Sequence, residues 1–364
     1  MTAADRIGIG WRRELAAGIL TNLERIDVVE VIADDLFRAS ARELRAMKTL
    51  AAQVPVVLHG VSLGLASSLK VDTSRLDSLA RVVHAIEPEF WSEHLAFVRG
   101  DGLEIGHLAA PPRTLATVHG AAENVARARR VVGTAPLLEN VATLIEPPGS
   151  ELPEVDWIAR VLVQSDAPLL LDLNNLYSNA VNFGSDPLQQ LRALPLERVR
   201  AVHLAGGKWI GPAGRERLLD DHLHAVPEPV YELLTELGAR APQPLSVVLE
   251  RDGAYPAFGE LLAELQRARQ ALLEGRRRAV APVSAVAARS EPPRRSDAAQ
   301  ALERFLVRLY TDEPTRRGFL RSPELFAARA GLESDVSKAL IGLDRVGLEL
   351  AARSFAHKRE RERP

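Results

Sequence analysis

Eight short apolar segments in the first 250 residues constrain the fold of this chain more than any other feature. Most are rich in leucine or β-branched residues and are bounded by turn residues, as β-strands are. They span 6–10, 28–32, 54–59, 90–94, 136–140, 169–175, 199–204 and 245–250. The segment that starts at Leu169 is apolar on both faces until Asp172, which is typical of a parallel strand covered by helices.

Helix-like stretches separate most of these segments. Apolar residues recur at helical spacing in 40–52, 74–86, 115–132, 157–163, 187–194 and 229–237. Strand–helix alternation predicts a parallel sheet, and eight strands in about 250 residues fit a closed (β/α)8 TIM-type barrel. The alternative is an open doubly wound sheet, which usually carries a glycine-rich phosphate loop after its first strand. The sequence after Gly8 does not complete such a loop, so the barrel is favoured.

The character of the chain changes near residue 275. Residues 276–296 are rich in Ala, Pro, Ser and Arg, which predicts a flexible linker whose basic residues are a solvated tether. Helical periodicity then returns, because Leu302, Phe305, Leu306 and Leu309 follow one helix face. We therefore expect a barrel domain over 1–275, a linker over 276–296, and a small all-helical domain over 297–364. One long helix is expected from about 334 to 355.

Composition excludes several kinds of chemistry. The chain has no cysteine, so it holds no disulfide, thiolate metal site or cysteine nucleophile. Any metal would need histidine, carboxylate or amide ligands. The net charge of −2 gives no reason to expect a nucleic-acid partner. No apolar run is long enough to cross a bilayer and no signal peptide is visible, so we expect a soluble cytoplasmic protein without a membrane partner.

Polar residues gather where the predicted strands end. These residues are His59, His94, Glu139 with Asn140, Asp172 with Asn174 and Asn175, His203, Glu250 with Asp252, and, in the loop after the seventh strand, Asp220, Asp221, His222 and His224. In a barrel all carboxyl-terminal strand ends meet at one mouth, where active sites lie. Such a nitrogen–oxygen donor set suits Fe(II), Mn(II) or Zn(II). Several carboxylates in one pocket repel unless cations neutralise them, which favours more than one metal ion.

Not every histidine or acid fits this pattern. His59, His94 and His203 occupy the same kind of position on three predicted strands. This recurrence favours a shared functional role, whereas a single histidine at a strand end would more often be structural. The histidines of helix-like, loop or tail segments are interpreted as structural or surface residues: His84, His107, His119 and His357. Asp34 and Asp35 follow the second strand and could equally cap the next helix. The role of His224 stays open.

Eight motifs occur in a fixed order over about residues 5–272. They are Gly8-Ile-Gly10, Leu58-His-Gly-Val-Ser62, Ser92-Glu-His-Leu95, Leu138-Glu-Asn140, Leu171-Asp-Leu-Asn-Asn175, His203-Leu-Ala-Gly206, Asp220-Asp-His222 and Leu249-Glu-Arg-Asp252. Each motif is weak alone, but the ordered set is specific. It resembles the multinuclear non-heme iron-dependent oxidative enzymes, the family of the methanobactin biosynthesis oxidase.

This resemblance implies two or three iron ions, mixed Fe(II) and Fe(III), at the mouth of a (β/α)8 barrel. The ligands it implies are His59, His94, Glu139, Asp172, Asn175, His203, Asp220, His222 and Glu250. Within that set Glu139 would be a bridging carboxylate. Strand alternation would instead pair Asp172 with Asn174, so the chain must leave strand geometry before Asn175.

The resemblance also implies a reaction. Family members use iron and dioxygen to modify ribosomally synthesised precursor peptides, often at cysteine, and many need a partner protein that presents the peptide. Asp252 is our candidate catalytic residue, for proton transfer or for supporting a ligand from behind; a salt bridge with Arg251 is the alternative. The family often has a histidine soon after its first motif, and this chain has Leu15 there, which leaves the role of that histidine without a counterpart.

The helical part lies outside the common barrel. Its segments 302–306, 317–320, 322–323 and 330–332 resemble the small helical domains related to the LigA subunit of extradiol dioxygenases. Two roles remain open for it: a fused peptide-presenting module, or an element for dimerisation or stability.

Two other functions remain open for the whole chain. One is a divalent-metal isomerase or endonuclease of the xylose-isomerase-like barrel type. The other is a non-catalytic metal-binding scaffold. An enzyme that cleaves DNA is expected to carry basic residues at the mouth, whereas these motifs are acidic and amide-rich.

Overall fold

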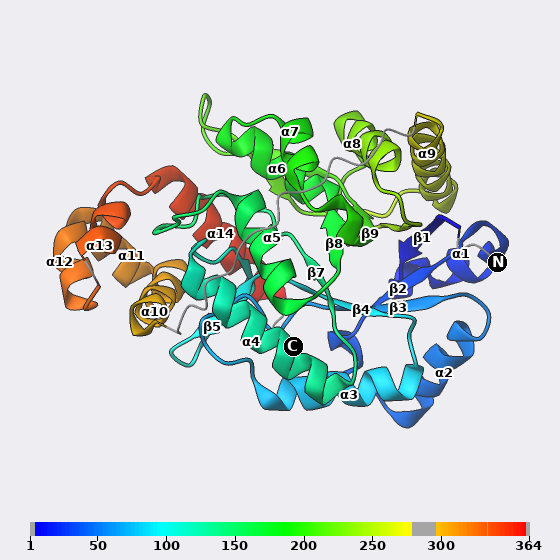
Figure 1. Ribbon diagram of the computed structural model, residues 1–364, viewed down its shortest axis with the longest axis horizontal. Coiled ribbons are helices and arrows are strands. Elements are labelled where there is room, and N and C mark those ends of the chain that lie inside the picture. Colours follow the sequence, from blue (N-terminus) through cyan, green and yellow to red (C-terminus); the bar gives the residue numbers. More distant parts are fainter. Residues whose placement is uncertain (1–3, 279–295, 333, 362–364) are drawn as a thin grey trace.

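The computed structural model of this chain is a closed barrel of eight parallel strands, surrounded by helices and followed by further helices (Figure 1). It describes residues 4–278, 296–332 and 334–361, so most of the predicted linker lies outside the described residues. In barrel order the strands are β1 (Arg6–Gly10), β12 (Ser246–Leu249), β9 (Val199–Leu204), β8 (Leu169–Asp172), β7 (Leu137–Glu139), β4 (Trp91–His94), β3 (Val56–Gly60) and β2 (Val29–Ile32). All eight predicted segments form barrel strands, and the open-sheet alternative is wrong.

Nine α-helices accompany the barrel in the described chain before residue 279. They are α1 (Ala16–Leu20), α2 (Ala41–Ala51), α3 (Thr73–Ile86), α4 (Leu115–Val132), α5 (Glu154–Ser165), α6 (Leu173–Phe183), α7 (Pro187–Ala193), α8 (Glu228–Arg240) and α9 (Phe258–Arg277). Four 3-10 turns complete this part: 13–15, 23–25, 34–36 and 196–198. The six predicted helices all form. Helix α2 begins where the sequence dictates, because Ser40 and Glu43 make a reciprocal capping box.

Two β-hairpins extend from the carboxyl ends of barrel strands. Strands β5 (Phe97–Gly100) and β6 (Leu103–Ala109) follow β4, and strands β10 (Gly207–Ile210) and β11 (Arg217–Asp220) follow β9. Both pairs are antiparallel. These four strands were not among the predicted segments, because β6 begins with two exposed residues and β10 is largely exposed, so neither reads as an apolar run. Their position brings them to the barrel mouth, and Asp220 is the last residue of β11.

Five helices occupy the described residues from 296 onward: α10 (Asp297–Thr311), α11 (Glu313–Arg321), α12 (Pro323–Arg329), α13 (Ser334–Ile341) and α14 (Arg345–Arg361). The single helix expected over 334–355 is wrong, because the chain leaves helical geometry at 342–344. Asp344 accepts a hydrogen bond from the Val346 N–H at 3.1 Å and starts a new helix there. Gly342 just before it is a residue that favours helix ends.

These helices share a hydrophobic core with the barrel domain. Phe97, Ile105 and Leu144 on the barrel side are buried in one cluster with Leu306 and Phe319 of the helices. In Figure 1 the orange and red helices lie at one side of the barrel, and α14 reaches back toward it. The helical part is therefore packed on the β5–β6 hairpin, and its role can be judged from that contact.

Glu303 on α10 is a polar anchor inside this interface. Its side chain is fully buried, and it accepts hydrogen bonds from the Ser67 hydroxyl at 2.6 Å and from the Ser68 N–H at 2.7 Å. The loop that carries Ser67 follows β3, whose end contributes to the barrel mouth. The hydrogen bonds of Glu303 therefore connect helix α10 to a loop at the barrel mouth.

We expect the stability difference between Glu303→Gln and the wild-type protein to depend on pH, because the Glu303 carboxyl is buried. Burial raises the pKa of Glu303 above 4.5, although the bonds from Ser67 and Ser68 oppose the shift. The folded protein then keeps a proton that the unfolded chain has lost, so wild-type stability falls as pH rises from 4.5 through the raised folded value. Glutamine does not ionise, so the Tm of the variant minus that of wild type should increase with pH over this range. Thermal unfolding at a series of pH values measures it; a constant difference would contradict the assignment.

Candidate metal centre

Seven buried polar side chains converge at the barrel mouth. They are Glu30, His59, His94, Glu139, Asp172, His203 and Glu250, none more than 7% exposed. The strand register aligns them: His94 on β4 lies beside Glu139 on β7, and Asp172 on β8 lies beside His203 on β9. Six of the seven were predicted as ligands, and the barrel brings them together as expected. Glu30 was missed, although it is the one charged residue within the apolar segment 28–32.

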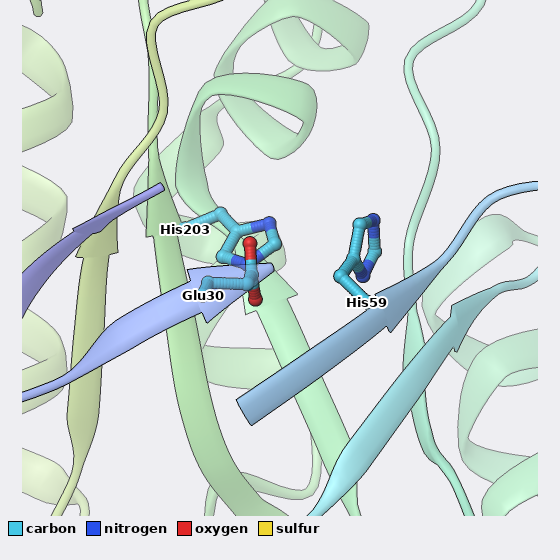
Figure 2. A group of neighbouring side chains, drawn as sticks. All are labelled: Glu30, His59 and His203. Atoms are coloured by element: carbon cyan, nitrogen blue, oxygen red, sulfur yellow. The ribbon is translucent and has the colours of Figure 1, made fainter. Parts of the chain in front are cut away.

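Potential ligand atoms of these residues form three overlapping groups, each with its atoms within 4.8 Å of one another. The groups are Glu30, His59 and His203; His59, His94 and Glu139; and Glu139, Asp172, His203 and Glu250. Figure 2 shows the first group, with Glu30 lying against His203 and His59 facing them from β3. His59, His203 and Glu139 each occur in two groups, and Glu139 is the carboxylate among them, so its two oxygens can reach two neighbouring sites.

In each of the three histidines, one ring nitrogen lies within hydrogen-bond distance of a buried polar partner. His59 Nδ1 lies 2.8 Å from the Ser92 hydroxyl, which also lies 3.4 Å from the Leu58 carbonyl. His94 Nδ1 lies 3.2 Å from the Gly60 carbonyl, which can only accept. His203 Nε2 lies 2.8 Å from Glu30 Oε2. Partners of this kind fix the tautomer of metal-binding histidines.

The second nitrogen of each ring faces Glu139. His59 Nε2 and His94 Nε2 lie 3.4 and 3.2 Å from Glu139 Oε2, and His203 Nδ1 lies 3.1 Å from Glu139 Oε1. Within the described chain Glu139 Oε2 has no hydrogen-bond partner, although it is buried. Three imidazole nitrogens thus point at one carboxylate that they do not fully satisfy.

Other buried oxygens point to the same need for a cation. Glu30 Oε1, Asp172 Oδ2 and Asn175 Oδ1 are buried and accept no hydrogen bond from any described residue. Buried polar atoms are nearly always paired, so each such atom requires an explanation. Lone pairs that converge from histidine, carboxylate and amide groups fit a divalent metal of the first transition row. The residues present therefore fit a metal centre.

Charges inside the cluster are strongly coupled. Burial opposes charge on His94, but Glu139 and Glu93 outweigh it and raise its pKa to about 9. Burial would raise the pKa of Glu139, yet His94, His203 and His59 lower it to about 2. Burial and the neighbouring Asp220 raise the pKa of Asp172 well above its ordinary value. Metal ligands must be deprotonated, so the raised pKa values of His94 and His203 mean that metal binding would release protons.

A second histidine–carboxylate group lies beside the inner cluster. His222 Nε2 is 2.9 Å from Asp220 Oδ2, and His222 Nδ1 is 3.3 Å from Asp252 Oδ2 and 3.6 Å from Glu250 Oε2. The predicted residues Asp220 and His222 are therefore at the mouth, joined to the inner cluster through Glu250. His224 is half exposed and its Nδ1 lies 2.9 Å from Asp221 Oδ1, so its contact among the described residues is directed away from the cluster.

Asp252 is held by Arg12. The Arg12 Nε donates to Asp252 Oδ1 at 2.9 Å, whereas Arg251 pairs with Glu264 at 3.0 Å. The alternative that Asp252 forms a salt bridge with Arg251 is wrong, because Arg251 turns toward α9. Burial opposes ionisation of Asp252, but His222 and Arg12 keep its pKa below the ordinary value.

Asn175 reaches the site because the strand ends early. The segment expected to run to residue 175 ends at Asp172, and α6 starts at Leu173. Asp172 Oδ1 caps this helix by accepting the Asn175 N–H at 2.6 Å, which places Asp172 and Asn175 together. Asn175 Nδ2 donates to the Asn140 carbonyl at 2.9 Å, while Asn174 turns to Asp220. Asp172 and Asn175 therefore lie together because Asp172 caps a helix. Strand alternation, which would pair Asp172 with Asn174, ends at Asp172, so the chain leaves strand geometry before Asn175 as the resemblance implies.

Above the cluster lies a cavity of about 670 Å³, a size typical of small-ligand sites. The lining includes His59, His94, Asn175 and His222 from the cluster. The upper walls come from β6, β11 and α14. His107 on β6 lines this cavity, so its interpretation as a structural or surface residue missed its position. Leu15, at the place where the family often has a histidine, is buried in the main hydrophobic core.

No helix in the described parts of the chain is long and apolar enough to cross a membrane.

Three comparisons relate this chain to known proteins. The model of a family described as RiPP precursor modification enzyme MbnB/TglH/ChrH matches residues 6–273. A UPF0276 protein of Streptomyces avermitilis is 35% identical over 97% of this chain and 77% of its own length. A UPF0276 protein of Acaryochloris marina is 35% identical over 74% of this chain and 95% of its own. Among solved structures, an L-ribulose 3-epimerase is 14% identical over 75% of this chain and 96% of its own, with a TM-score of 0.49.

Proposed function

This chain belongs to the MbnB/TglH/ChrH family of enzymes that modify RiPP precursors, and on that premise we propose that it oxidises a ribosomally synthesised peptide with iron and dioxygen. The modified position is a cysteine or a neighbouring residue. The reaction takes place in the cytoplasm, where such precursors are made. The observation that carries the proposal is the set of three imidazole nitrogens directed at the buried Glu139 under a cavity of substrate size.

Two or three irons, mixed Fe(II) and Fe(III), are the proposed cofactors. The proposed ligands are His59, His94, Glu139, Asp172, Asn175, His203, Asp220, His222 and Glu250. Glu139 is the carboxylate that belongs to two of the three groups, which supports a bridging role for it. Glu30 is proposed to orient His203 from behind, because it takes the Nε2 side and leaves Nδ1 toward Glu139 and Glu250.

Bound iron would supply the one-electron and dioxygen chemistry that the side chains of this chain do not provide. The protein positions the groups around it. Asp252 has one oxygen engaged by Arg12 and the other turned to His222, which supports a positioning role over proton transfer.

The helical part is proposed to bind substrate. We assign catalysis to the barrel domain with its last helix α9, which ends at Arg277, a tether to the residues between 277 and 297, and substrate binding to a helical domain over 297–364. A separate peptide-presenting protein would then be needed only for the parts of the peptide that these helices do not reach.

Dioxygen uptake tests the function. The protein, purified without oxygen and reconstituted with iron, is mixed with the peptide of a neighbouring short gene and any small protein encoded beside it. We expect peptide-dependent oxygen consumption and a mass change in the peptide. A protein that holds only zinc, or that consumes no oxygen after iron loading, would favour the isomerase-like or scaffold alternatives.

A further inference from the structure

Helix α14 turns one face to the metal cavity. Ala351, Ser354, Phe355 and Lys358 all line the cavity, and their spacing of three and four residues places them on one side of the helix. The helix is fixed to the barrel side, because Arg359 Nη1 donates to the Ile105 carbonyl at 2.5 Å. One wall of the reaction cavity therefore comes from beyond residues 6–273, the part that the family model matches.

The cations at this cavity differ in whether they are already paired. Arg12 is bound to Asp252, and Arg75 lies 3.2 Å from Glu104. Lys358 is half-buried and forms no ion pair with a carboxylate of the described chain. It is thus the lining cation whose charge is available to a ligand.

The surroundings of Lys358 make this wall suitable for a peptide. The Phe355 ring packs edge-on against His107, with centroids 5.3 Å apart. Burial lowers the pKa of His107 well below its ordinary value, and Lys358 lowers it further, so His107 stays neutral. The wall offers an apolar surface with one positive charge, opposite a floor of metal-ligand candidates.

We propose that Lys358 forms a carboxylate-binding subsite, which holds an acidic side chain of the substrate peptide while a nearby thiol reaches the metal centre. This proposal rests on the proposed function, since it takes the substrate to be a peptide that contacts the metal. A charge-assisted hydrogen bond from a half-buried amine is stronger than one in open water. Lys358 is therefore a specificity-determining residue supplied by the carboxyl-terminal helices.

Matched peptides test the subsite through binding. The full-length protein is loaded with Co(II) and titrated without oxygen with acetyl-Cys-Asp-amide and acetyl-Cys-Asn-amide, and with the same pair carrying a glycine before the last residue. Thiolate-to-cobalt absorption reports binding without turnover. For at least one spacing, wild type should bind the Asp peptide about tenfold tighter than its Asn partner. Lys358→Met and Lys358→Gln should bring the two affinities within about twofold, and Lys358→Arg should keep most of the preference.

Arg353→Met is the matched control. Arg353 is exposed on the same helix and lies off the cavity-lining stripe, so its loss removes one charge without touching the subsite. The control should keep the wild-type preference. Equal affinities in wild type, or a preference that survives both neutral Lys358 variants, would overturn the subsite alone. An absence of thiolate absorption with every peptide would overturn the proposed function and the subsite with it.

Discussion

Replacing Glu139 by alanine is expected to remove more than one metal ion from each chain. Glu139 faces a ring nitrogen of His59, His94 and His203, and it belongs to two of the three possible metal-binding groups. A terminal ligand affects one ion, whereas a shared carboxylate affects the ions on both of its sides. Elemental analysis of anaerobically purified, iron-loaded protein gives the number of ions lost.

Two comparisons make this result specific. His94 occurs in one group only, so His94→Ala should lower metal content less than Glu139→Ala does. Glu154→Gln removes the charge of a largely buried carboxylate that pairs with Arg113 at 3.0 Å outside the cluster, and it should leave metal content unchanged. Circular dichroism confirms that each variant is folded. A Glu139→Ala protein that loses no more metal than His94→Ala would contradict the bridging role, and unchanged iron in His94→Ala would contradict its ligand role.

Removal of the carboxyl-terminal helices is the second change with a large expected effect. A chain that ends at Arg278 would expose Phe97, Ile105 and Leu144, which are buried against those helices. A large exposed apolar patch promotes aggregation, so we expect this protein to be poorly soluble or to unfold at a markedly lower temperature. Size-exclusion chromatography and thermal unfolding measure both effects.

A point variant separates packing from the loss of a whole domain. Leu306 is fully buried in the shared core, so Leu306→Ala should cost about 2–5 kcal/mol of the stability of the helical part. Its metal content should stay at the wild-type value, because Leu306 lies away from the cluster. A truncated protein that is monomeric with a wild-type Tm would contradict the shared core. Because truncation is expected to damage the fold, Lys358 variants test substrate binding more cleanly than deletion does.

The barrel could be predicted because its strands are buried on both faces. Such strands are continuous apolar runs, as in Leu169–Asp172, and their polar ends stand out sharply in the sequence. The strand ends of a closed parallel barrel meet by geometry alone. His59 and Glu139 could therefore be placed together, although they are 80 positions apart in the sequence. The family resemblance then favoured Asn175 over Asn174, and the helix cap made by Asp172 gives the physical reason.

Other features depend on tertiary contacts that have no periodic signal. The β5–β6 and β10–β11 hairpins are partly exposed insertions, so their strands lack the continuous apolar runs that mark the barrel strands. Glu30 lies within an apolar strand, where the sequence pattern does not mark it as a site residue. Its contact with His203 shows that it belongs to the cluster. Lys358 lies in a highly charged tail, where its sequence neighbours suggest a solvated surface. Its place at the cavity follows from how α14 packs on β6, which local sequence does not encode.

The number of irons bound by the wild-type protein tests the central claim most directly, namely that the barrel strand ends form a multinuclear metal centre. The protein is reconstituted with Fe(II) without oxygen, desalted, and analysed for iron per chain. The overlapping groups around Glu139 predict two or three tightly bound irons per chain, in line with the family resemblance. Retention of one iron or less in the folded protein would contradict the account.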